Sequence, residues 1–398
     1  MDWIVDRTKF RLIRKVAEGG MGSVYEAVQL GSEDFQKIVA VKTILDEYLK
    51  DREFVDMFIG EAKLVADLVH QNIVQVYSLG RSGNALYISM EYVHGVNLEE
   101  FLDHHGELGQ QILVELVAFI ISRVCLGLHY AHTKTDTGGQ LLGVVHRDIS
   151  PKNIMIDMQG VVKITDFGIA KAQNVMRNRE GELLLGKIQY MSPEQANFET
   201  TDHRSDIFSL GIVMYELLSG RNVFNDPSTK RTLENVRHMS VPPIRQYNPN
   251  VPEEIDHILT KALERDRERR YQTADEFGFD LQYFMYRDRF GPTYQSLEAY
   301  LKEIFPHFRN PKVSRSLGVS ARYRSVADTA VIHRDDESNV QEAEQVGSED
   351  QTRVLRGSPP PSSASASAIN FDHPRADSQP LDPGEDVPLD DHAAETES

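Results

Sequence analysis

The feature that most constrains this chain is the stretch 146–168, where carboxylate and amide side chains lie between short apolar runs. The stretch begins His-Arg-Asp-Ile-Ser-Pro-Lys-Asn and ends Asp-Phe-Gly. Asp148, Asn153 and Asp166 each lie close to a run of β-branched and aliphatic residues that is typical of a short strand. Two carboxylates and an amide in this pattern can hold Mg²⁺ and orient a hydroxyl group. We therefore expect the chemistry of the protein to centre here.

Two weaker signals precede this stretch. Residues 17–24 form a glycine-rich turn whose backbone can approach a phosphate chain closely, although an ordinary β-hairpin explains the turn equally well. Lys42 ends an apolar run, where an inward ammonium needs an anionic partner, and Glu61 on the next helical segment can supply one. Taken separately, a strand-edge lysine and a solvated glutamate are the simpler interpretation of this pair.

The pattern of apolar residues divides the chain into a β-rich part and a helical part. Up to residue 95, β-branched runs alternate with turn residues, apart from an amphipathic helix expected at 53–69. From 98 to 308 the helical period dominates. Its most apolar segment, 112–128, is interrupted by polar residues and is shorter than a membrane span, which predicts a buried core helix. Strands are expected at 10–16, 23–29, 38–42, 74–79 and 86–92, and further helices at 207–218, 253–263 and 274–284.

Composition argues against several classes of function. The formal net charge is −18 and the isoelectric point lies near 5.2, an acidic balance that argues against binding to nucleic acid. Cys125 is the only cysteine, which excludes an intramolecular disulfide and a cysteine zinc cluster and fits a reducing, cytoplasmic setting. The charged N-terminus lacks the apolar core of a secretory signal, so we expect neither export nor a membrane partner.

The composition changes near residue 311. From there to the end, the chain has 17 Asp and Glu against 8 Lys and Arg, and low-complexity Ser, Pro and Ala fill 357–368. Few apolar side chains remain to offset the entropy of ordering, so a disordered tail is predicted.

The order and spacing of the motifs resemble the protein kinase family over about residues 10–290. The shared features are the glycine-rich loop, the strand lysine, the helix glutamate, the loop at 146–153, Asp-Phe-Gly, and Ser-Pro-Glu at 192–194. The resemblance implies an α+β, two-lobed protein kinase fold.

The domain boundaries that follow from this resemblance are a β-rich N-lobe at 10–94, a helical C-lobe at 95–290 and the tail at 311–398. Between the C-lobe and the tail, residues 291–310 predict one more amphipathic helix. We expect this helix to pack on the C-lobe, with binding of a partner as the alternative.

The resemblance also implies roles for individual residues, with ATP and Mg²⁺ as cofactors and Mn²⁺ as an alternative metal. Asp148 would orient the substrate hydroxyl and accept its proton, and Asn153 and Asp166 would hold the metal. Lys42, held by Glu61, would contact the α- and β-phosphates. The other implied nucleotide contacts are Ala17, Gly19, Gly22, Val24, Ala40, Met90, Glu91, Val93 and Met155.

Supporting contacts are implied in the same way. The family has a buried aspartate that grips the catalytic loop, a buried ion pair, and an apolar stack that joins the two lobes. The matching residues here are Asp206 for the aspartate, Glu194 and Arg270 for the ion pair, and His146, Phe167, Val65 and Val76 for the stack.

Two departures from the family pattern concern the substrate side of the site. Family serine/threonine kinases have Lys two residues after the catalytic aspartate and Thr after a later glycine, whereas this chain has Ser150 and Lys187. Lys187 can supply the ammonium that is missing at 150, and we favour it because the two positions meet in the family fold. Lys152 is the second candidate, because tyrosine kinases place a cation at that position.

The segment 166–186 contains no Ser, Thr or Tyr, so its phosphorylation is not expected to be the main switch. Glu180 or Glu182 would then be a permanent partner for Arg147, and two solvated glutamates are the alternative. The variant motifs and the long turn at 133–143 are similar to those of bacterial serine/threonine kinases.

Two threonines in the tail, Thr329 and Thr352, each precede an aliphatic residue by three places. This spacing resembles ligands of phosphothreonine-reading forkhead-associated domains, and autophosphorylation there would recruit such a partner. Chance recurrence of the spacing is the alternative.

We therefore predict a cytoplasmic, ATP-dependent kinase of Ser/Thr hydroxyls in proteins, with autophosphorylation. The alternative is a kinase-fold scaffold or pseudokinase that acts through its tail, which the changes at Ser150 and Lys187 keep open. A small-molecule phosphotransferase is disfavoured, because Ser-Pro-Glu at 192–194 and Asp206 are implied to build a platform for protein substrates.

Overall fold

The computed structural model describes residues 3–5, 8–19, 22–44, 48–50, 52–83, 85–167, 188–288 and 290–306. By its internal contacts the chain separates into two units, Met1–Val331 and Ile332–Ser398, and every described residue belongs to the first unit. The predicted tail lies outside the described residues.

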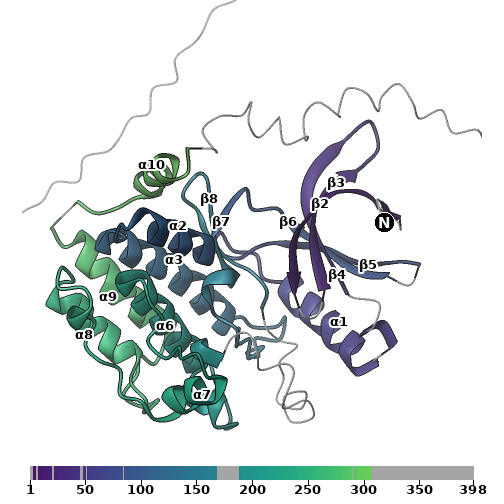
Figure 1. The fold of residues 1–398 in the computed structure, drawn as a ribbon. Helices are drawn as coiled ribbons and strands as arrows, with labels where there is room; N and C mark the ends of the chain where they lie inside the picture. The colour runs from purple at the N-terminus through teal and green to yellow at the C-terminus, as the bar shows by residue number, and fades with distance from the viewer. Residues whose placement is uncertain are drawn as a thin grey trace, which may run out of the picture. The chain divides into compact units, whose positions relative to one another are not determined.

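The N-terminal part is an antiparallel sheet of six strands in the order β1-β2-β3-β4-β6-β5 (Figure 1). Phe10, Val39, Val41 and Tyr87 from its strands meet in one apolar cluster. The strands are β1 (Trp3–Val5), β2 (Lys9–Gly19), β3 (Gly22–Leu30), β4 (Gln36–Ile44), β5 (Val76–Ser82) and β6 (Ala85–Glu91).

The helix expected at 53–69 is α1 (Arg52–Ala66), and it packs beside β5. Phe58 and Ala62 on its inner face contact Ile44, Leu86 and Ile88 of the sheet. The helix ends earlier than expected because the chain turns at once, with the Leu68 amide bonded to the Val65 carbonyl.

A second, three-stranded sheet links the β-rich part to the helices. It consists of β7 (Gly95–Asn97), β8 (Ile154–Asp157) and β9 (Val162–Ile164), all antiparallel. Ile164 of β9 also bonds to the segment before β5: its amide donates to Asn72 and its carbonyl accepts from Val74, at 2.8 and 2.9 Å. This bridge fixes Asp166, which follows β9, relative to the N-terminal sheet.

The C-terminal part is helical and has one large apolar core. Its central helix, α3 (Val114–His132), is the one described helix that has the length and apolar composition of a membrane span, but 67% of that stretch is buried inside the molecule. It is thus the core helix that the sequence predicted. The other helices are α2 (Leu98–Leu108), α5 (Pro193–Ala196), α6 (Arg204–Ser219), α7 (Thr229–His238), α8 (Glu253–Ala262), α9 (Ala274–Tyr286) and α10 (Tyr294–Ile304).

The last described helix, α10, packs on the helical part next to α2 (Figure 1). Thr293 and Ser296 form a capping box at its start, which fixes where the helix begins. Leu297 and Leu301 of α10 are completely buried in the large core. Of the two alternatives for this helix, the structure shows the packed one.

Candidate active site

A cavity of about 480 Å³ lies where the first sheet meets β7, β8 and α2. It has the size of a small-molecule site. Nine of the residues singled out in the sequence line it: Ala17, Val24, Ala40, Met90, Glu91, Val93, Lys152, Met155 and Asp166.

The inner part of this cavity is an apolar slot. Ala40 of β4 faces Met90 of β6 in the sheet register, and with Val74 and Val93 they form a small buried cluster. Val24 and Met155 pack against this cluster. The slot suits a flat, largely apolar ring such as a purine, which would gain from burial while polar groups at its edge meet the backbone.

The glycine-rich turn joins β2 to β3, with Gly19 opposite Gly22 in the register. A Cβ atom at Gly22 would lie 2.0 Å from the Thr43 carbonyl oxygen, so no other residue fits there. Ala17, at the position of the first family glycine, pairs with Val24 in the sheet. The methyl group at Ala17 is thus accommodated by an ordinary strand position.

The ammonium of Lys42 contacts the carboxylate of Asp166, with Nζ and Oδ1 2.8 Å apart. Asp166 is therefore one anionic partner of the strand lysine. The side chain of Glu61 lies outside the described residues, so its predicted contact with Lys42 stays a prediction. Asp166 has φ +56°, in the left-handed region that few residues other than glycine adopt, and such strain clusters at functional sites.

Asp148 is held in place by Asn153. The side-chain amide of Asn153 donates to the backbone carbonyl of Asp148 at 2.8 Å and to its carboxylate oxygen Oδ2 at 2.9 Å. Because the amide nitrogen is committed to Asp148, the amide oxygen is the atom of Asn153 that can ligate a cation. Asp166 and Asn153 thus offer one carboxylate and one amide oxygen, a donor set that fits Mg²⁺ when phosphate oxygens complete its shell.

Asp206 of α6 anchors the loop that carries Asp148. The backbone amides of His146 and Arg147 donate to the two carboxylate oxygens of Asp206, at 2.8 and 2.7 Å, and His132 bonds to the same carboxylate at 2.8 Å. Burial acts to raise the pKa of Asp206, but these hydrogen bonds and the nearby imidazoles hold the pKa below its usual value. Arg147 has φ +62°, so the anchor also maintains a strained backbone.

His146 and Phe167 join the loop to the Asp166 segment. Their rings lie 4.6 Å apart, and Phe167 is buried in the large core together with Val65 of α1, against which Val76 packs. The Asp148 amide donates to His146 Nδ1, which leaves the Nε2 proton to bond the Thr165 carbonyl at 3.1 Å. The expected apolar stack is therefore present.

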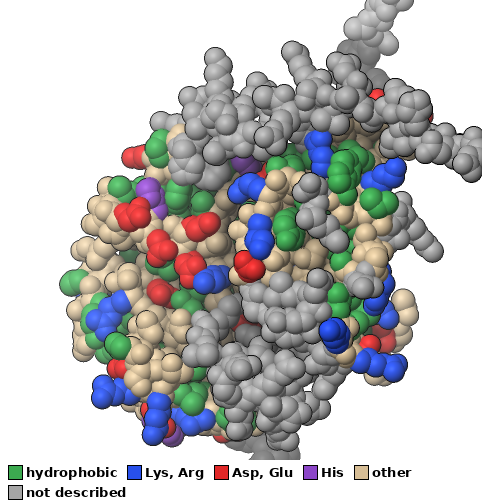
Figure 2. All heavy atoms as spheres, turned by 45° about the vertical axis from the view of Figure 1, so that its right-hand side comes forward, with side chains coloured by type: hydrophobic (Ala, Val, Ile, Leu, Met, Phe, Trp, Pro, Cys, Tyr) green, Lys and Arg blue, Asp and Glu red, His purple; other side chains and the backbone are tan. Residues whose placement is uncertain are grey.

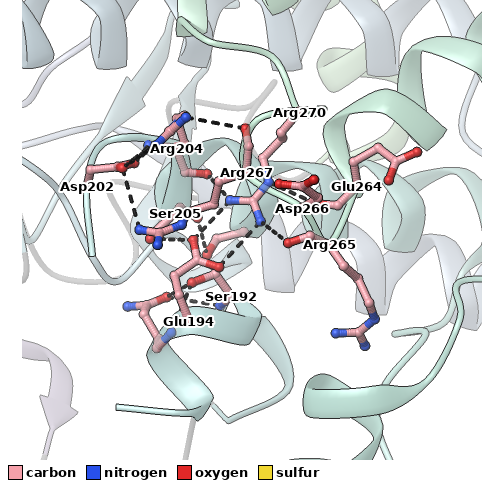
Figure 3. A network of polar contacts seen from close by, with 12 residues as sticks. Ser192, Glu194, Asp202, Arg204, Ser205, Glu264, Arg265, Asp266, Arg267 and Arg270 are labelled. Carbon is pink, nitrogen blue, oxygen red and sulfur yellow. Dashed lines mark hydrogen bonds and ion pairs between the residues drawn. The ribbon is translucent and has the colours of Figure 1, made fainter. Parts of the chain in front are cut away.

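A buried network supports the segment that follows Lys187 (Figure 3). Arg270 donates to both carboxylate oxygens of Glu194, at 2.9 and 3.3 Å, and the Ser205 hydroxyl donates to the same carboxylate at 2.7 Å. Burial acts to raise the pKa of Glu194, but the bonds from Arg270 and Ser205 outweigh it and hold the pKa below its usual value. The predicted Glu194 to Arg270 ion pair is present.

This network connects to the catalytic loop through one residue. Gln195, which forms a capping box with Ser192, donates its side-chain amide to the Arg147 carbonyl at 3.0 Å. The position of the Asp148 loop therefore depends on α5 as well as on α6.

On the face in Figure 2, several acidic side chains gather on the helical part. Burial raises the pKa of Glu216 of α6, and Glu99 and Asp103 of α2 act in the same direction. Lys152 pairs with Glu99, with 3.3 Å between Nζ and Oε1, and its side chain is 59% exposed.

Ser150 occupies the place of the usual family lysine and is 1% exposed. Its hydroxyl makes no hydrogen bond within the described part of the chain. Several residues weighed in the sequence lie outside the described residues, and their roles stay predictions: Lys187, Glu180, Glu182, Thr329 and Thr352.

Sequence reasoning missed other residues of the cavity. Arg14 of β2 and Tyr92 line it and meet at Glu26, where Arg14 Nε donates at 2.7 Å and the Tyr92 hydroxyl at 3.1 Å. Lys163 of β9 pairs with Glu91 at 3.0 Å. No local motif marks these residues, because Tyr92 and Lys163 find their partners 66 and 72 positions away in the chain.

Comparison with known families gives one match over most of the described chain. A family model described as "Protein kinase domain" matches residues 10–278. Tyrosine-protein kinase MasK of Myxococcus xanthus (strain DK1622) is 38% identical over 304 residues, which cover 76% of this chain and 47% of MasK. Serine/threonine-protein kinase PrkC of Bacillus subtilis (strain 168) is 33% identical over 313 residues, 78% of this chain and 46% of PrkC.

Serine/threonine-protein kinase PknB of Mycolicibacterium smegmatis is 37% identical over 270 residues, 66% of this chain and 41% of PknB. The chain thus spans about half the length of the curated relatives it matches. Among solved structures, the kinase domain of Mycobacterium tuberculosis PknI shares the fold, with a TM-score of 0.51 and 23% identity over 69% of this chain and 94% of that domain. The predicted two-lobed fold is confirmed.

Proposed function

This chain belongs to the protein kinase family, and from that premise we propose that it transfers the γ-phosphate of ATP to serine and threonine hydroxyls of proteins. The observation that carries the proposal is the position of Asp148. Asn153 holds its carboxylate, and Asp206 holds the backbone of the two residues before it. A carboxylate fixed in this way can accept the hydroxyl proton without first losing rotational freedom.

Each residue of the site then has one task. The apolar slot around Ala40 and Met90 binds the base, and Lys42 neutralises phosphate charge. Asp166 and Asn153 hold Mg²⁺, which screens the charge of the phosphates when it is bound. Asp148 aligns the acceptor hydroxyl and takes its proton. Phosphoryl transfer needs alignment and charge stabilisation more than covalent help, and these residues supply both.

Because Ser150 replaces the usual lysine, another residue must supply the positive charge near Asp148. We assign it to Lys187, with Lys152 as the second candidate. Lys152 is mostly exposed and pairs with Glu99, which supports the choice of Lys187. The kinase-fold scaffold, which acts through its tail without catalysis, is the alternative that the changes at Ser150 and Lys187 keep open.

The acceptor class is the finer part of the proposal. PrkC and PknB are named serine/threonine kinases, whereas MasK is named a tyrosine kinase. We expect Ser/Thr acceptors, including Thr329 and Thr352 of the same chain, where phosphate would create a ligand for a forkhead-associated domain.

The test is to incubate the purified full chain with ATP and Mg²⁺, or Mn²⁺, beside an Asp148→Asn variant, and to map phosphate by mass spectrometry. Phosphate on Ser or Thr in the wild type only is the expected result. Phosphate on Tyr alone would change the acceptor class. ATP binding without any phosphate transfer would contradict the proposal and favour the scaffold.

A further inference from the structure

One residue of the cavity comes from outside the region that the family model matches. The match ends at residue 278, and α10 begins at Tyr294. Phe305 directly follows α10, yet it lines the same cavity as Ala40, Met90 and Asp166. Part of the cavity wall thus comes from a segment that the match does not cover.

The segment is firmly docked. Leu297 and Leu301 are completely buried, and the Tyr294 ring lies 5.3 Å from the Phe119 ring of α3. The start of α10 passes so close to the turn between β8 and β9 that a Cβ atom at Gly160 would lie 2.2 Å from the Tyr294 carbonyl oxygen. These contacts therefore fix the position of α10 on the helical part.

The end of α10 is fixed on α2. His104 Nε2 lies 2.8 Å from the Ile304 carbonyl oxygen, and the His104 and Phe305 rings stack with 4.7 Å between their centres. Phe305 is only 5% exposed and also lies near the Phe101 ring. The cavity receives Glu100 from the first turn of this same helix and Asn97 from its N-cap.

We propose that Phe305 is a nucleotide-binding residue, and that docking of α10 and binding of the nucleotide stabilise each other. This inference rests on the proposed function, since it takes the cavity to be the ATP site. Phe305 lines the cavity, and its ring also fixes the end of α10 on α2, so a base or sugar in the cavity would rest on a wall that only docked α10 completes.

Coupling of this kind is reciprocal. If docked α10 tightens nucleotide binding, the bound nucleotide must stabilise docked α10 by the same factor.

The test uses the full chain and Phe305→Ala, with Mg-ADP affinity measured by calorimetry and steady-state kinetics in ATP. We expect Kd for ADP and KM for ATP to rise about 2- to 5-fold, with kcat within about 2-fold, because the cavity loses part of its wall equally in the ground and transition states. Phe305→Leu keeps the apolar volume that docks α10, and it should give a smaller rise. Phe290→Ala is the matched control, because that ring is 91% exposed and does not line this cavity.

Hydrogen exchange supplies the second readout. In the wild type, Mg-ADP should slow exchange of the amides of α10, and this protection should shrink in Phe305→Ala. Equal KM and Kd values in Phe305→Ala and Phe290→Ala, with no protection of α10, would overturn the inference. A wild type that binds neither ADP nor ATP would instead refute the proposed function, so the two failures are distinguishable.

Discussion

The side-chain amide of Asn153 bonds to Asp148 twice, once at the backbone carbonyl and once at the carboxylate, at 2.8 and 2.9 Å. The amide therefore ties the proposed metal ligand and the proposed base into one unit. The two positions are five apart in the chain, and the short helical turn at Pro151–Asn153 brings them together.

Asn153→Ala removes both bonds and one ligand oxygen. We expect kcat to fall on the order of 10²-fold, because the Asp148 carboxylate is no longer aligned and the metal loses a ligand. Asn235→Ala is the control, since its side-chain amide donates to the Phe224 carbonyl and Asn235 does not line the cavity. Turnover of Asn153→Ala close to that of the control would contradict the assigned role.

Lys42→Ala leaves the Asp166 carboxylate without its ammonium partner. We expect kcat/KM for ATP to fall about 10²- to 10³-fold, since the charge that opposes the phosphates is lost. Lys37 lies on the same strand, but its side chain is exposed and its ammonium rests on the Tyr77 ring. The control variant Lys37→Ala should therefore keep full activity. Steady-state kinetics at varied ATP distinguish the two variants.

Glu194→Gln removes the charge that compensates the fully buried Arg270 guanidinium. Breaking one side of a buried pair costs about 3–5 kcal/mol, and urea unfolding should show a loss of free energy of unfolding in this range. Glu268→Gln affects an exposed partner of Arg204 and should change that free energy by less than about 1 kcal/mol. A loss no greater than that of Glu268→Gln would show that the network does not stabilise the fold.

Acid should destabilise the protein through Glu194 and Asp206. Both carboxylates have pKa values below their usual range in the folded state, so their contribution to stability is complete above the unfolded pKa, about 4. That contribution disappears as the pH falls below about 4 and through the lower folded pKa values. Thermal midpoints between pH 7 and 3 should fall more steeply for the wild type than for Glu194→Gln, and parallel curves would contradict this account.

This chain has Ser150 and Lys187 where the family pattern has Lys and Thr. Restoring the family residues tests whether Lys187 replaces the missing lysine. Lys187→Ala should lower kcat at least about 10-fold, whereas Lys152→Ala should have little effect, because its ammonium is mostly exposed. Ser150→Lys combined with Lys187→Thr should recover activity relative to Lys187→Ala. If both single lysine variants keep full turnover, neither lysine replaces the missing charge.

Local patterns in the sequence predicted much of the fold. Strand and helix periods identified the β-rich part, α1, the buried α3 and the amphipathic α10, because the position of apolar residues on one face is a local property. The motifs of the site were also visible, since each lies within a few consecutive residues, as in 146–153.

Contacts between distant segments were not visible in this way. Lys42 and Asp166 are separated by 124 positions, and no local motif predicted their ion pair. The cluster of Arg14, Glu26 and Tyr92 likewise joins β2 and β3 to the segment after β6, which no motif connects.

The sequence by itself determined which residue types are present for phosphoryl transfer, because charge, glycine content and apolar period are written along the chain. Only the tertiary structure decided which of them meet. Asp206 reaches the loop of Asp148 because α6 packs against α3, and Phe305 reaches the cavity because Leu297 and Leu301 bury α10 in the core. Burial of apolar faces drives this packing without regard to sequence separation, so the position of a polar group in the site follows from the whole core.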